Sequence, residues 1–264
     1  MSGTPPVNGT PPVSRIRSSA LPLLGAVAAV GLWWSATAVF GIRAFFLPAP
    51  PDIVAAFRRQ PGYLMREAGS TVTVTVTGFG IAVAAGLLLA VVLTAWRALE
   101  RATLPVLVAL NSVPKVAVAP LLVVWLGFGA QPKIVLVVLI CFFPVVVATM
   151  AGLTSTPAEL SELSRSLSAS VWQAYLKIRL PWALPQMFVG LKVAISLAVI
   201  GAVVAEINNP TGGLGSVIVL SGMSFDTPLA FAAITLLALL STTLFYLVVL
   251  AERLVVPWAR AISG

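Results

Sequence analysis

The sequence has no histidine, a single cysteine and few charged residues. Charged residues make up 9% of the 264 residues, hydrophobic residues make up 59%, and the mean hydropathy is +1.04. A soluble domain carries about 25% charged residues, so this composition predicts a membrane protein. The lone Cys141 excludes a disulfide within the chain. Without histidine, the usual zinc sites and histidine-dependent catalysis are excluded as well.

A phosphate-binding loop of the form G-x-x-x-x-G-K-[ST] is also missing from the sequence. We therefore expect that the chain does not hydrolyse ATP and holds no metal or cofactor of its own. The net charge of +8 is compatible with nucleic-acid binding. In a membrane protein, however, basic residues more often mark cytoplasmic loops. We predict a lipid bilayer, and no nucleic acid, as the environment of the chain.

Six apolar stretches are long enough to cross a bilayer, which takes roughly 20 residues per helix. They lie at about 21–40, 70–96, 103–128, 134–153, 186–207 and 229–256. Residues 1–18 contain a doubled GTPPV and have too little apolar surface to fold, so they predict a disordered cytoplasmic tail. The predicted fold is an all-α membrane protein in which residues 19–264 form one domain of six transmembrane helices.

Six spans place both termini on one side of the membrane, and the arginine and lysine distribution indicates which side that is. The tail, the loop at 97–101, the loop at 154–185 and the C-terminus together carry nine basic residues. The connections on the other side carry five, namely Arg43, Arg58, Arg59, Arg66 and Lys133. We therefore predict a multi-pass plasma-membrane protein with both termini in the cytoplasm.

The loop at 154–185 is far longer than a turn between two spans requires. Thr156 and Glu159 form a capping-box pattern with proline between them, which predicts a helix start. Ser170 and Gln173 form a second, weaker capping box, and Leu180-Pro181 is predicted to end that helix before the next span. The loop is then either a docking surface for another protein or an interfacial hairpin resting on lipid headgroups.

Residues 162–181 of this loop resemble the cytoplasmic signature E-A-A-x3-G-x9-I-x-L-P of permease subunits of binding-protein-dependent ABC importers. Its positions are occupied by Glu162, Leu163, Ser164, Ser168, Ile178, Leu180 and Pro181. Serine stands where the family has glycine, and if that position needs positive φ, the serine costs free energy.

The resemblance implies a type I ABC importer permease core, in which this loop docks on an ATPase subunit. It implies a role in ATPase coupling for Glu159, Glu162, Leu163, Ser164, Leu167, Ser168, Ala169, Ile178, Leu180 and Pro181.

The likeness extends from about Pro48 to Trp258. The segments NSVPKVAVAPLLVVWLGFG and GAVVAEINNPTGGLGSVI are similar to the nitrate/sulfonate/taurine permease group, and VPKVAVAPL and FDTPLAFAA to its thiamine-pyrimidine or riboflavin-like branch. The resemblance implies two ATPase subunits that carry ATP and Mg, a second permease copy and an extracytoplasmic solute-binding protein. The solute would be a small polar or anionic organic molecule. A stand-alone secondary carrier or channel is the alternative, although such proteins usually show intramembrane carboxylates or an inverted repeat.

Ionisable groups inside a span are functional hypotheses by default. Lys115 follows Asn111, Ser112 and a proline within the third predicted span, and Glu206 ends the fifth span shortly before Asn208. These five residues are the candidates for the solute pathway or its gates. The alternatives are that Lys115 reaches a headgroup or an acidic partner from a kinked helix, and that Glu206 caps a neighbouring helix.

Three further patterns are structural. Asp226 is predicted to cap the sixth span. Glu252 and Arg253 are interpreted as solvated side chains that anchor the inner end of that span. Small residues in the second span predict close helix packing; they are Gly78, Gly80, Ala82, Ala84, Ala85 and Gly86.

Overall fold

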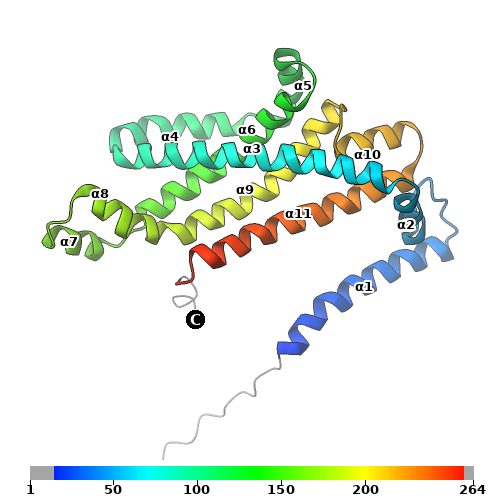
Figure 1. Ribbon diagram of the computed structural model, residues 1–264, viewed down its shortest axis with the longest axis horizontal. Coiled ribbons are helices and arrows are strands. Elements are labelled where there is room, and N and C mark those ends of the chain that lie inside the picture. The colour runs from blue at the N-terminus through cyan, green and yellow to red at the C-terminus, as the bar shows by residue number, and fades with distance from the viewer. Residues whose placement is uncertain (1–14, 259–264) are drawn as a thin grey trace, which may run out of the picture.

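The computed structural model describes residues 15–258, apart from the side chains of residues 15–23, 97, 161, 163–165, 171 and 172. Residues 1–14 of the predicted tail lie outside this range, and the first helix already begins at Arg15, inside the tail as we expected it. The described residues form helices joined by short connections (Figure 1). The longer helices are α1 (Arg15–Val39), α3 (Pro61–Ala95), α4 (Arg97–Ser112), α5 (Lys115–Leu126), α6 (Ala130–Thr154), α9 (Leu180–Asn208) and α11 (Thr227–Val255).

Among residues 15–258, four helices are long and apolar enough to cross a membrane: α3, α6, α11, and α9 together with the π-helix before it. The pair α4 and α5 counts as a fifth span when it is taken as one broken element. The apolar part of α1 within the described residues, Leu24–Val39, belongs to the shorter class of helix. The structure thus bears out an all-helical, multi-span fold, with four or five spans by length where the sequence predicted six.

The third predicted span, 103–128, is wrong as a single helix. It divides into α4 and α5, which meet at an angle of 87°. Val113 has extended backbone angles, with φ −68° and ψ 128°, and Pro114 caps α5. A residue before proline is sterically driven out of the α region, and proline has no N–H to continue the helix. The same two residues therefore cause the break.

The core of the molecule is a three-helix contact in which α6 packs against both α3 and α9. Small residues allow the close approach: a Cβ on Gly78 would lie 2.6 Å from the Val137 side chain, and one on Gly86 would lie 2.8 Å from Val145. Gly78, Ala82 and Gly86 are buried and four residues apart, hence on one face of α3, while Gly80 is exposed. Close packing was correctly predicted for this stripe and was wrong for Gly80, Ala84 and Ala85, which are exposed.

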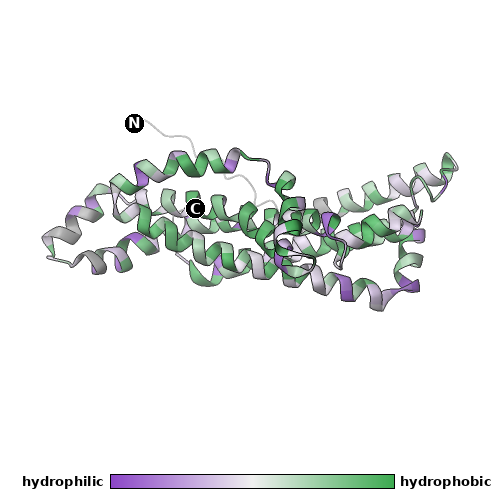
Figure 2. Cartoon of the chain, turned by 90° about the horizontal axis from the view of Figure 1, so that it is seen from above, coloured by the Kyte–Doolittle hydropathy of each residue, from purple (hydrophilic) through white to green (hydrophobic). Residues whose placement is uncertain are grey.

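The two ends of the bundle carry different structures (Figure 1). The loop end holds the turn between α3 and α4, the short helices α7 (Ala158–Ser166) and α8 (Val171–Ala174), and a π-helix, η1 (Tyr175–Arg179). The cap end holds α2 (Pro50–Arg59), α10 (Leu214–Met223) and the turn at 209–213. Figure 2 shows apolar residues along the middle of the long helices and most hydrophilic residues toward these ends.

Candidate functional site

The loop end begins where α6 stops. The predicted capping box at Thr156 is wrong, since its Oγ1 is buried without a hydrogen-bond partner and α7 begins only at Ala158. The last turn of α6 continues to Ser155, whose N–H donates to the carbonyls of Ala151 and Gly152, and Thr156 lines a cavity instead of capping α7. The second box is confirmed: Ser170 N–H donates to Gln173 Oε1 at 3.0 Å, and Gln173 N–H donates to Ser170 Oγ at 3.2 Å.

The turn between α7 and α8 is strained at the serine that replaces the signature glycine. Ser168 has φ +50°, a left-handed conformation that costs a residue with a Cβ roughly 1–2 kcal/mol. We predicted a free-energy cost at this position if its φ is positive, and φ is positive in the structure. The backbone geometry of a glycine position is therefore kept without the glycine.

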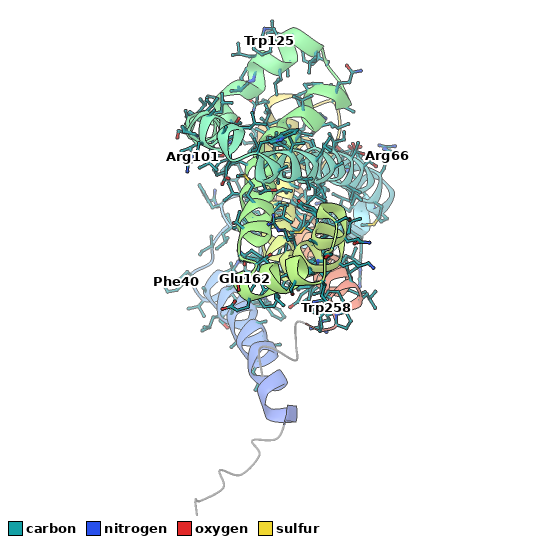
Figure 3. All side chains as sticks on the ribbon, turned by 90° about the vertical axis from the view of Figure 1, so that its left-hand side faces the viewer. Phe40, Arg66, Arg101, Trp125, Glu162 and Trp258 are labelled. Atoms are coloured by element: carbon teal, nitrogen blue, oxygen red, sulfur yellow. The ribbon has the colours of Figure 1, made fainter. Side chains whose placement is uncertain are left out.

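Four of the candidate coupling residues form an exposed surface at this end, and Ala169 beside them is half-buried. Glu159, Glu162, Leu167 and Ser168 are exposed, and Leu167 keeps 72% of its surface accessible. Figure 3 looks onto this end, with Glu162 on the near side. Leu163 and Ser164 belong to α7, but their side chains lie outside the described residues. Leu167 directly follows the nine-residue polar helix α7, and an exposed leucine there points to contact with lipid or with another chain.

The predicted break at Leu180-Pro181 is wrong. Helical structure runs without interruption from Tyr175 to Asn208, 34 residues. The wider π-turn makes this possible: Leu180 N–H bonds to Tyr175 O, five residues back, which relieves the clash of the Pro181 ring with the preceding turn. Ile178, Leu180 and Pro181 thus lie on the continuous helix that enters the bundle.

At the cap end, three side chains cap the first turn of α10. Gly213 N–H donates to Glu67 Oε2 at 2.7 Å, Leu214 N–H to Thr71 Oγ1 at 2.8 Å, and Gly215 N–H to Glu206 Oε2 at 2.8 Å. Thr71 Oγ1 in turn donates to Glu206 Oε1 at 2.8 Å. These groups satisfy the free donors of a helix N-terminus and place two carboxylates at its positive end.

The turn that precedes α10 is held by a second layer of contacts. Lys133 Nζ donates to Gly212 O at 2.8 Å, and Asn209 Nδ2 donates to Gly129 O at 3.0 Å. Lys133 and Asn209 are almost fully buried, at 3% and 0% exposure. We call Glu67, Thr71, Lys133, Glu206 and Asn209 the α10 clamp.

The clamp accounts for Glu206 in the way the sequence left open, as the cap of a neighbouring helix. Asn208, the other candidate on α9, is exposed and donates from Nδ2 to Val204 O of its own helix at 2.8 Å. Sequence reasoning missed the roles of Glu67, Thr71 and Lys133. The signal for the first two was their spacing of four residues, which places both on one face of α3.

The remaining candidates lie at the α4–α5 bend. Lys115 Nζ donates to Asn111 O at 3.0 Å and to Asn111 Oδ1 at 2.6 Å, so it neutralises the carbonyl end of α4. Ser112 Oγ bonds back to Val108 O at 3.0 Å. The hydrogen bonds of Lys115 therefore remain at the bend, while those of Glu206 run to α3 and α10.

A further ion pair lies between α9 and α11. Lys192 Nζ contacts Glu252 Oε2 at 3.0 Å and Oε1 at 3.1 Å, and the two side chains are 25% and 22% exposed. Glu252 was interpreted as a solvated anchor, and that interpretation is wrong. Because Lys192 reaches it from the next helix, the carboxylate is neutralised inside the bundle.

Comparison with known proteins places these features in a family. A model of the binding-protein-dependent transport system inner membrane component matches residues 82–260. The riboflavin transport system permease protein RibX of Chloroflexus aurantiacus is 36% identical over 228 residues, covering 86% of this chain and 85% of the relative. The formylaminopyrimidine transport permease protein ThiX of Halalkalibacterium halodurans is 32% identical over 228 residues, covering 86% and 91%.

A third relative and a solved structure extend the comparison. The putative aliphatic sulfonates transport permease protein SsuC of Bacillus subtilis is 30% identical over 237 residues, covering 89% of this chain and 86% of the relative. A chain of the inward-facing MetNI methionine ABC transporter superposes with a TM-score of 0.66 at 21% identity, covering 75% of this chain and 98% of that one. The fold is therefore that of a type I ABC importer permease.

Proposed function

The chain belongs to the inner membrane components of binding-protein-dependent transport systems, and on that premise we propose that it forms the solute pathway of an ATP-driven importer. Residues 154–181 couple this pathway to separate ATPase subunits. The ATPase pair binds ATP and Mg, and this chain supplies the membrane helices and the docking loop.

One observation carries the coupling role. The helix that starts in the docking loop, at Tyr175, is the same helix that ends at the α10 clamp, at Asn208. A helix rises 1.5 Å per residue, so these 34 continuous helical residues, which include the π-helix and Pro185, span roughly 50 Å. Force applied by an ATPase to α7 and α8 would therefore reach Glu206 and the turn that it holds.

The clamp suits a gate on the solute-binding-protein side. Glu67 and Thr71 come from α3, Lys133 from α6 and Glu206 from α9, so all three core helices meet at one short turn. Relative movement of any of them changes the position of α10. Asn111, Ser112 and Lys115 at the α4–α5 bend are proposed to line the pathway, where the lysine offers one cation to a polar or anionic solute.

A second copy of the chain is the proposed partner within the membrane. In α11 only 6% of the most apolar 18-residue window is buried, and in α3 only 28%. An intramembrane pathway needs polar groups facing protein or water rather than lipid. A paired permease would cover the apolar faces that a single chain leaves open and would enclose Lys115.

For the solute we propose a small polar organic molecule, in the range from pyrimidine or flavin-like heterocycles to sulfonates. The relatives named for riboflavin and formylaminopyrimidine match at 36% and 32% identity, and the sulfonate relative at 30%. No contact among the described residues favours the stand-alone carrier that the sequence left open. A thermal-shift screen of the cognate binding protein with these three classes identifies the solute.

The coupling role is tested by charge reversal of Glu162 and by a bulky residue at Ala169. Glu162→Arg should abolish solute uptake and solute-stimulated ATP hydrolysis, because it places a cation on the docking surface, while the thermal stability of the spans stays unchanged. Ser224→Arg, at an exposed position of the cap end, is the control that also introduces an arginine but away from the ATPase. Unchanged uptake by both Glu162→Arg and Ala169→Trp would refute the docking role.

A further inference from the structure

A cavity of about 200 Å³ lies at the loop end, and its lining includes none of the candidate coupling or pathway side chains named above. Four elements line it: Thr94 from the end of α3, Glu100 from the first turn of α4, Thr156 after α6, and Tyr175 and Arg179 from η1. Most of its lining surface is polar. Thr94 and Arg179, which are 85 residues apart in the chain, thus line the same polar cavity.

Two hydroxyl groups of this cavity lack partners. Thr156 Oγ1 and Tyr175 Oη are buried and make no hydrogen bond within the described residues. Thr94 and Thr154, which also line the cavity, instead donate to carbonyls of their own helices at 2.8 Å. Buried hydroxyls without partners are costly, so these two leave the hydrogen bonding around the cavity incomplete.

The cavity also has one group of each charge. Arg179 and Glu100 both line it, and neither takes part in the ion pairs that the structure shows among its described residues. Arginine binds phosphate through a planar fork of donors, and a carboxylate accepts hydrogen bonds from an ammonium group. A ligand with both a phosphate and a primary ammonium matches this pair better than a simple anion, which Glu100 would repel.

The position of the cavity indicates where such a ligand comes from. It lies where α3 and α6 end, next to Trp96, which is 63% exposed between α3 and α4. Exposed tryptophans at span ends mark the headgroup layer of a bilayer. The volume is below the roughly 300–1,000 Å³ of sites for drug-sized ligands and suits a headgroup more than a whole cofactor.

We propose that this cavity binds a phosphoethanolamine group. Arg179 pairs with the phosphate, Tyr175 and Thr156 donate to its oxygens, and Glu100 accepts from the ammonium. The group comes either from phosphatidylethanolamine in the bilayer or from free phosphoethanolamine. When bound, it bridges η1 to α4 and so fixes the base of the docking loop against the membrane helices.

Native mass spectrometry of the full-length chain, released from phosphatidylglycerol nanodiscs with equal traces of phosphatidylethanolamine and phosphatidylcholine, tests the proposal. The wild type should retain phosphatidylethanolamine about tenfold over phosphatidylcholine, whose quaternary ammonium cannot donate to Glu100. Arg179→Gln should reduce retained phosphatidylethanolamine about tenfold, and Glu100→Gln should abolish the preference between the two lipids. Arg101→Gln removes an exposed charge one residue from Glu100 and should change neither.

A second arm separates the two sources. Protein in lipid-free detergent is titrated with phosphoethanolamine and followed by thermal shift: stabilisation lost in Arg179→Gln assigns a free ligand, whereas none, together with lipid retention, assigns the bilayer. If Arg179→Gln fails to fold, Tyr175→Phe with Thr156→Val replaces it. Equal retention of the two lipids by the wild type, an equal loss in Arg101→Gln, or binding in neither arm would overturn the proposal.

Discussion

Thr71 and Glu206 lie 135 residues apart in the chain and share a 2.8 Å hydrogen bond between Oγ1 and Oε1. The same two side chains accept from consecutive amides of α10, those of Leu214 and Gly215. One hydroxyl therefore joins α3, α9 and α10 at a single point in the buried interior. This arrangement explains why a carboxylate can be fully buried at the end of a span, at 0% exposure.

Thr71→Val should destabilise the protein markedly. Valine keeps the shape of threonine but leaves Glu206 Oε1 and the Leu214 amide without a partner, and each buried unsatisfied group costs about 1–3 kcal/mol. The apparent Tm in detergent should fall by several degrees. Thr73→Val is the matched control, because Thr73 is exposed and bonds only to Gly69 O of its own helix. Equal Tm changes in the two variants would contradict the clamp.

Gly78→Ala and Gly80→Ala should differ in sign or size, although the positions are two residues apart on α3. A Cβ at Gly78 meets Val137 at 2.6 Å and Ile134 O at 3.1 Å, whereas a Cβ at Gly80 meets nothing within 4 Å. Overpacking costs about 1–3 kcal/mol, so Gly78→Ala should lower the Tm and Gly80→Ala should leave it unchanged or raise it slightly. A tolerated Gly78→Ala would argue against the α3–α6 contact.

The Lys192–Glu252 pair should behave as a partly buried ion pair. Lys192→Met alone leaves an unpaired, partly buried carboxylate and should cost about 1–3 kcal/mol, while Lys192→Met with Glu252→Leu should recover most of the loss. Arg253→Met removes the neighbouring exposed cation and should have little effect. The measurement is a double-mutant cycle on thermal unfolding. Additive losses in the double variant would show that the two groups do not interact.

Substitutions in the docking loop should shift its local stability in opposite directions. Ser168→Gly removes the strain at φ +50° and should stabilise the turn by about 0.5–1 kcal/mol. Ser170→Ala removes the cap that accepts from Gln173 N–H and should cost about 1 kcal/mol. Hydrogen exchange of the amides in residues 166–175 reports both changes. Faster exchange in Ser168→Gly would contradict the strained turn.

Features set by neighbouring residues could be predicted from the sequence. The capping box at Ser170 and the cap of α11 by Asp226, whose Oδ1 accepts from Leu229 N–H at 3.2 Å, are local and are confirmed. The apolar spans α3, α6, α9 and α11 follow from composition. Pro114 indicated a bend between α4 and α5, but the angle of that bend depends on how α5 packs against α6 and α9.

Features that depend on distant segments could not be predicted. Nothing near Thr71 indicates that it meets Glu206, and nothing near Lys192 indicates Glu252, because each pairing is set by helix packing. The failed cap at Thr156 and the continuous helix at Pro181 are of the same kind. Thr156 lines a cavity instead of capping α7. The π-helix before Pro181, which no simple residue pattern predicts, accommodates the proline within a continuous helix.

The central claim, that the loop end docks an ATPase, is tested most directly by crosslinking from two single cysteines of equal exposure at opposite ends. Leu167 and Met223 are 72% and 73% exposed, at the loop end and the cap end. The native Cys141 is fully buried and donates from Sγ to Ala194 O, so it should stay unreactive. In native membranes, Leu167→Cys should crosslink to an ATPase subunit and Met223→Cys should not. An ATPase adduct at Met223→Cys, or none at Leu167→Cys, would contradict the account.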